Sequence, residues 1–121
     1  VQERLVRNHL DSLVLPLERQ LGMQVDIFLT DSPCGIELSK HGRQYTSRGS
    51  YAVKDGFRKL MSWYGLQRVK GVSRMRIEDN MYQRVVGTFD RVAEHMQRQG
   101  GTYEYFIVLR YDIFFDRPFL T

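Results

Sequence analysis

Apolar residues recur at helical spacing in three stretches of the chain, and each stretch is followed by a glycine that can end a helix. We therefore predict three amphipathic helices, which end near Gly22, Gly65 and Gly100. An interior proline costs an α-helix one hydrogen bond, so the first helix is expected to bend between Ser12 and Pro16. The three apolar stripes consist of Leu5, Val6, Leu10, Leu13, Val14, Leu17 and Leu21; of Val53, Phe57, Leu60, Met61 and Tyr64; and of Ile77, Met81, Val85, Phe89, Val92 and Met96.

Three other stretches have the composition of β-strands. Residues Val25–Thr30 are short, β-branched and aromatic, and residues Leu66–Val72 form a weaker candidate because they include lysine and arginine. Residues Tyr103–Asp116 are almost continuously apolar and predict the strongest strand of the chain. The long connection after the first strand is expected to contain one or two helical turns between Gly35 and His41.

The order helix, strand, helix, weak strand, helix, strong strand predicts a single α/β domain over residues 1–121. Right-handed crossovers would build a Rossmann-like, mostly parallel sheet flanked by helices. The first helix would then cover a strand that the sequence does not contain, so we expect a sheet that is incomplete at the N-terminus and belongs to a larger protein.

Composition narrows the possible chemistry. A formal net charge of +4 and a pI near 9.4 allow an anionic partner. With Cys34 as the single cysteine, neither an internal disulfide nor a cysteine-based zinc cage can form. No apolar run approaches the length of a membrane span, and neither familiar glycine-rich phosphate motif is present.

Two charged residues stand in the closing apolar stretch, where Arg110 and Asp112 would point to the same face of a strand. Asp112 and Asp116 offer the oxygen ligands that Mg²⁺ and Mn²⁺ prefer, and the Arg110 guanidinium matches phosphate. These groups suit a diphosphate, although a structural Arg110–Asp112 ion pair explains the same pattern. Asp31 follows the first strand and could meet a nucleoside at the same edge of the sheet, or could form a turn with Ser32 and Pro33.

The closing stretch, Tyr105-Phe-Ile-Val-Leu-Arg-Tyr-Asp112 followed by Ile-Phe-Phe-Asp-Arg-Pro-Phe119, resembles the strand that ends in the acidic metal-binding motif of GT-A-type glycosyltransferases. In that family the motif is typically Asp-x-Asp, so Asp112 matches it while Arg110 stands at its first position. The resemblance implies a nucleotide-binding portion that holds a nucleotide-sugar donor with a divalent metal and transfers the sugar to a carbohydrate or glycoprotein acceptor. It also implies no nucleic-acid partner, and a secretory or Golgi location if the protein is a eukaryotic transferase.

Two other functions remain open from the residues alone. A non-catalytic α/β interaction module would use the basic segment from Arg68 to Arg76 to dock an acidic partner. A nuclease-like metal enzyme would use Asp112 and Asp116, but the sequence offers no lysine close to them and only the distant Lys70. We interpret Glu78 and Asp79 first as charges in the first turn of the third helix, where negative charge interacts favourably with the helix dipole.

Overall fold

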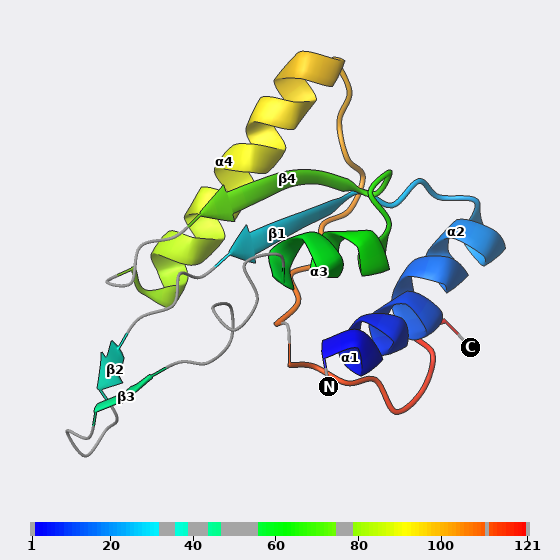
Figure 1. Ribbon diagram of the computed structural model, residues 1–121. Coiled ribbons are helices and arrows are strands. Elements are labelled where there is room, and N and C mark those ends of the chain that lie inside the picture. The colour runs from blue at the N-terminus through cyan, green and yellow to red at the C-terminus, as the bar shows by residue number, and fades with distance from the viewer. Residues whose placement is uncertain are drawn as a thin grey trace.

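A computed structural model describes residues 2–31, 36–38, 44–46, 56–74, 79–110 and 112–120 of the chain. It has a mixed α/β architecture in which the helices and strands largely follow the predicted order (Figure 1). The elements are α1 (Gln2–His9), η1 (Leu10–Val14), α2 (Leu15–Leu21), β1 (Ile27–Asp31), β2 (Ile36–Leu38), β3 (Gln44–Thr46), α3 (Gly56–Tyr64), β4 (Val69–Arg74) and α4 (Met81–Gln99).

The first helix is continuous but departs from α geometry where the sequence predicted a bend. Residues Leu10–Val14 form a π-helical segment, and the N–H group of Leu15 donates to the carbonyl of Leu10. Pro16 has no N–H group to offer the carbonyl of Ser12 four residues earlier. That carbonyl instead accepts a hydrogen bond of 2.7 Å from the N–H group of Phe119. The proline therefore leaves this carbonyl without a donor four residues along the helix, and the N–H group of Phe119 supplies one.

The sheet around which the helices pack is parallel. β1 pairs with β4 in parallel from Ile27 opposite Val69 to Asp31 opposite Arg74. Both strands were predicted from the sequence, and β4 extends two residues beyond its predicted end. Two parallel strands with covering helices confirm the α/β class, but a Rossmann-like sheet requires more strands than the described residues provide.

A second pair of strands occupies the connection after β1. β2 and β3 are antiparallel, with Glu37 opposite Tyr45. The helical turns expected between Gly35 and His41 are therefore wrong for the described residues 36–38, which are extended. Ile36 and Leu38 flank Glu37 in the alternating pattern of a strand, and that pattern outweighs the weak helical signal.

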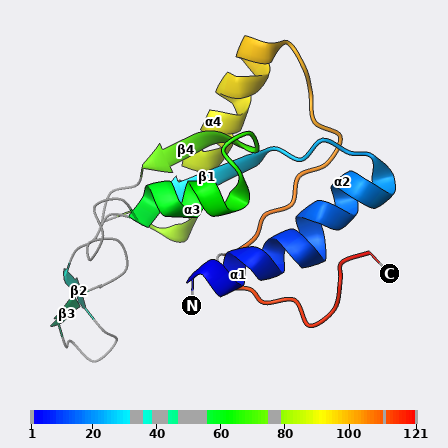
Figure 2. The same cartoon turned by 45° about the vertical axis from the view of Figure 1, so that its right-hand side comes forward.

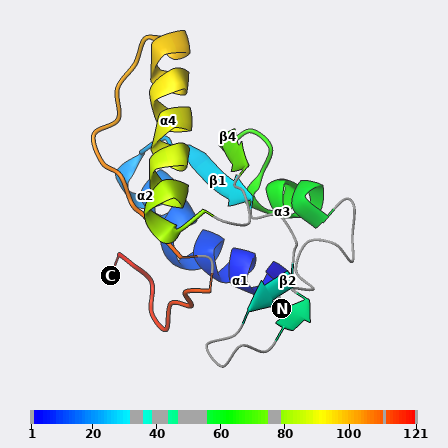
Figure 3. The same cartoon turned by 90° about the vertical axis from the view of Figure 1, so that its left-hand side faces the viewer.

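The helices form one layer on each side of the sheet. α4 lies against one face of β1 and β4, and α3 lies with the long α1–η1–α2 helix on the other side (Figures 2 and 3). The buried apolar side chains gather mainly in this second layer, where Val6, Leu13 and Val14 of the first helix and Tyr64 of α3 are buried. Val92 is the buried apolar residue of α4 among the described residues.

α4 has well-defined ends. Asn80 caps it, because its side chain accepts from the N–H group of Gln83 at 2.9 Å while the Gln83 side chain accepts from the N–H group of Asn80 at 2.8 Å. Gly100 ends the helix in the left-handed conformation, with φ of 70°. Asp79 therefore precedes the helix and does not lie in its first turn, while Glu78 and Ile77 lie outside the described residues.

The closing strand predicted over Tyr103–Asp116 is wrong for the residues that the structure describes. Residues 101–110 and 112–120 contain neither helix nor strand, and the chain crosses from the end of α4 to run along α1 (Figure 2). Contacts that are not a strand ladder hold this segment. The Asn8 side chain donates to the carbonyl of Phe115 at 3.0 Å and accepts from its N–H group at 2.7 Å.

Candidate functional site

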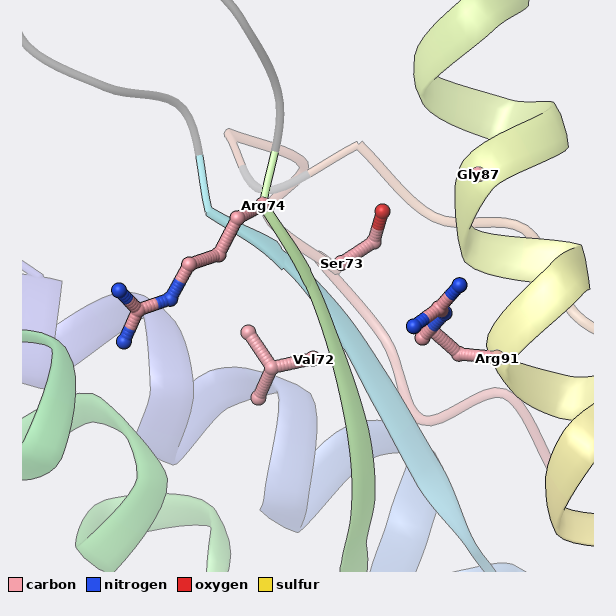
Figure 4. Close-up of a pocket in the computed structure, with 5 residues that line it drawn as sticks. All are labelled: Val72, Ser73, Arg74, Gly87 and Arg91. Atoms are coloured by element: carbon pink, nitrogen blue, oxygen red, sulfur yellow. The ribbon is translucent and has the colours of Figure 1, made fainter.

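A pocket of about 470 Å³ opens at the carboxyl edge of the sheet, between β4 and α4 (Figure 4). In α/β sheets this edge is where ligands bind. Ser73 and Arg91 point toward the space between strand and helix, whereas the side chain of Arg74 extends to the other side of β4. The pocket is lined by Val72, Ser73, Arg74, Gly87 and Arg91.

The face of α4 that meets this pocket is basic. Arg84 and Arg91 are seven residues apart, so two helical turns place them on the same side of the helix with Gly87 between them. The Nε atoms of both arginines are buried and have no hydrogen-bond partner in the described part of the chain. Of the two arginines only Arg91 lines the pocket, and its side chain as a whole is 43% exposed although its Nε is buried.

Arg91 is held in place by a second group. One of its terminal nitrogens lies 3.0 Å from Oε1 of Glu94, one turn along the helix. This ion pair is about half exposed, so it contributes little stability but restricts the guanidinium.

Hydroxyl groups complete the polar edge. Thr30 of β1 and Ser73 of β4 stand opposite each other in the parallel register. The hydroxyl of Thr30 hydrogen-bonds to that of Thr88, which also donates to the carbonyl of Arg84 at 2.9 Å. The seam between α4 and the sheet is therefore polar at its carboxyl end, while Phe28 packs edge-on against His95 nearer the amino end.

Gly71 allows α4 to approach this part of the sheet. A Cβ atom at Gly71 would lie 2.9 Å from Cδ1 of Phe28 and 3.3 Å from Cβ of Arg91. The first distance is too short for two carbon atoms, so a side chain here would push the phenyl ring or the helix outward. The glycine thus sets the separation between β4 and Arg91.

The predicted ligand residues at the end of the chain lie outside this pocket. Arg110 and Asp112 form an ion pair of 2.8 Å, with side chains 70% and 62% exposed. Asp116 is also exposed. Asp31 is the last residue of β1 and stands opposite Arg74, so the sheet brings it to the edge where the pocket opens. Only Asp31 is brought near the pocket by its strand; the other three are on the segment after α4.

No group of three or more possible metal ligands occurs among the described residues. Metal binding by Asp112 and Asp116 therefore stays a prediction from the sequence. No described helix has the length and apolar character that crossing a bilayer requires.

Two further polar clusters join elements. Arg68 holds Glu18 with two hydrogen bonds of 2.8 and 2.9 Å, and this contact lowers the pKa of the Glu18 carboxyl. The hydroxyl of Tyr103 donates to Asp26 at 2.5 Å, and the pKa of Tyr103 is raised, first by burial and then by this carboxylate. Since Glu18 occupies Arg68, the basic segment predicted as a docking surface has one charge fewer to offer a partner.

The sequence did not single out Ser73, Arg84 and Arg91. The two arginines belong to a helix whose apolar stripe drew attention, and charged residues on the rest of a helix usually face solvent. Their spacing of seven and the glycine between them are the signals that could have revealed the basic face.

Known proteins offer no further guide to this site, because neither family models nor curated proteins nor solved structures gave a match to the chain.

Proposed function

We propose that the chain binds a phosphorylated ligand in the pocket between β4 and α4. The observation that carries this proposal is the position of Arg91 and Ser73, whose side chains point into the pocket at the carboxyl edge of the sheet. Guanidinium donors match the oxygen atoms of phosphate, as they match those of carboxylate. The pocket volume of about 470 Å³ falls in the range of small-molecule sites.

The pocket residues would share the work of binding. Arg91 would donate from its guanidinium to a phosphate oxygen, while Glu94 restricts the guanidinium. Ser73 adds a hydroxyl at the end of β4, and Gly87 leaves room for the ligand beside the helix. Asp31, at the neighbouring strand end, is placed for a sugar or base attached to the phosphate.

Within this class we propose a nucleotide sugar, with transfer of the sugar to an acceptor as the reaction. The support is the resemblance of the closing segment to the glycosyltransferase motif, together with the position of the pocket at the carboxyl edge of a parallel sheet. Asp112, to which the resemblance assigns a divalent metal, lies outside this pocket, so the phosphate site at Arg91 does not itself require a metal held by Asp112.

Isothermal titration calorimetry can test the binding step with pyrophosphate and with UDP- and GDP-sugars, each with and without Mn²⁺. We expect Arg91→Ala to weaken binding about 10- to 100-fold, the effect of losing a charge-assisted hydrogen bond. Arg91→Lys should also weaken binding, because it keeps the charge but loses the planar guanidinium that matches phosphate.

Arg98→Ala is the matched control, since Arg98 is an exposed arginine in the last turn of the same helix. Its removal should change the affinity little beyond the loss of one distant charge. If the Arg91 and Arg98 variants lose the same binding affinity, the binding is a nonspecific electrostatic effect and does not depend on the pocket. Binding of pyrophosphate with no preference for any nucleotide sugar would retain the phosphate site and refute the transferase proposal.

A further inference from the structure

The segment from Glu104 to Arg110 is apolar between its two charged ends, and the described residues provide its backbone with few of the hydrogen bonds that such a stretch usually makes. Tyr105 and Val108 are 72% and 67% exposed, and Phe106 and Ile107 are about half exposed. In the described part of the chain, no backbone group of residues 104–109 takes part in a hydrogen bond. A β-patterned segment with free N–H and C=O groups can pair with another strand.

A second apolar surface lies beside this segment. Tyr82, Val86 and Phe89 follow one another at helical spacing on α4, and all three are exposed. This stripe lies on the far side of α4 from Arg84 and Arg91, so it is separate from the pocket. Phe106 packs edge-on against Phe89 with ring centroids 5.6 Å apart, which joins the segment to the stripe. The combined apolar surface marks an interaction site.

The charged ends of the segment match each other when two copies of it run antiparallel. If two copies pair antiparallel with Ile107 opposite Ile107, then Glu104 of each copy stands opposite Arg110 of the other. Apolar residues then face apolar residues throughout the interior of the ribbon. Parallel pairing in register would instead place Arg110 beside its own counterpart, and like charges opposite each other are destabilising.

We infer that this surface binds a second copy of the chain through an antiparallel, two-fold symmetric pairing of residues 104–110. The two-fold axis passes near Ile107, so both ends carry a Glu104–Arg110 contact between copies. An isolated two-stranded ribbon is marginally stable in water. Here the stripe of Tyr82, Val86 and Phe89 in each copy supplies an apolar surface beside the ribbon.

Charge reversal tests this register directly. Sedimentation equilibrium on the unmodified chain should show a dimer that dissociates on dilution. Arg110→Glu and Glu104→Arg should each weaken dimerisation about tenfold, because each turns two attractive cross-strand contacts into repulsive ones. The double variant Glu104→Arg/Arg110→Glu should recover the affinity of the unmodified chain.

Asp112→Asn serves as the control for the ion pair that Arg110 makes in its own chain, and it should leave the dimer intact. Ile107→Lys should give a folded monomer, since two lysines would meet at the symmetry axis. The inference is overturned if the unmodified chain remains monomeric at high concentration, as it would if residues 104–110 paired with the free edge of β1. It is equally overturned if the double variant fails to recover dimerisation while circular dichroism shows it folded.

Discussion

The helix–sheet body and the segment after α4 are both rich in apolar residues, yet they are held in different ways. In the body, β1 and β4 pair in a parallel ladder with one shift of register after Ile27, and apolar side chains are buried between the layers. After α4, the chain is anchored at separate points. Tyr103 binds Asp26, and further along Ile113 and Phe115 bind side chains of α1.

This difference shows that an apolar β-pattern does not by itself produce a strand. A strand also needs an edge with which its backbone groups pair. The closing segment instead meets the first helix, where the carbonyl of Ser12 in η1 and the side-chain amide of Asn8 in α1 bind backbone groups that a ladder would otherwise use. Variants of α1 can therefore separate the stability of the body from the anchoring of the segment.

The largest effect is expected at His9, where body and segment meet. His9 is 1% exposed; its Nε2 lies 2.6 Å from the carbonyl of Ile113 and its Nδ1 lies 2.7 Å from the hydroxyl of Tyr64. Because a carbonyl can only accept, Nε2 carries the proton. His9→Ala would leave a cavity and remove a partner of both groups, so the free energy of unfolding should fall by about 3 kcal/mol.

Urea unfolding followed by circular dichroism measures this change, and Arg7→Ala on the exposed side of α1 is the control. A surface substitution of that kind should alter stability by no more than about 0.5 kcal/mol. If both variants lose the same small amount, His9 does not link the body to the segment.

The elements that the sequence predicted correctly are those whose residues carry a local signal. The apolar stripe of α4 and the glycine after it identified a helix that the structure confirms. Pro16 likewise located the irregular turn of the first helix. The closing segment failed because strand formation depends on a partner edge far away in the sequence, and no local pattern reports where that edge is.

The candidate site was harder to predict for a related reason. Arg84 and Arg91 become notable only when their Nε atoms are seen to be buried beside the sheet. The sequence instead drew attention to Arg110 and Asp112, since charges in an apolar stretch are conspicuous. The structure pairs these two residues with each other in solvent, so their role in binding stays a prediction.

A smaller and more local effect is expected at Asn8, whose side chain binds the backbone of the segment at Phe115. Asn8→Ala removes the paired hydrogen bonds to the backbone of Phe115, each worth about 1 kcal/mol. Hydrogen exchange at the Phe115 amide should accelerate by about tenfold or more, while the amide of Leu29 in β1 keeps its rate.

Asn8→Asp is the graded control, because it retains the oxygen that accepts from Phe115 but loses the donor to its carbonyl. Its acceleration should lie between those of the unmodified chain and Asn8→Ala. Acceleration of the same size at Leu29 would mean that the segment and the body open together, and the contrast between them would be lost.

The smallest effect is expected within the body, at the contact between Glu18 and Arg68. Their side chains are 25% and 17% exposed, so solvent weakens the pair and Glu18→Gln should cost about 1 kcal/mol at neutral pH. The hydrogen bond from Arg68 lowers the pKa of Glu18 in the folded chain, so the unfolded chain binds a proton at higher pH. The stabilisation is thus present above the ordinary carboxyl pKa of about 4.5 and is lost as the pH falls through the lowered value.

Urea unfolding from pH 7 downward should therefore show the unmodified chain and Glu18→Gln converging in acid. Asp90→Asn, which removes an exposed carboxylate of α4, should keep a constant small offset, and a constant offset for Glu18→Gln as well would contradict the pairing.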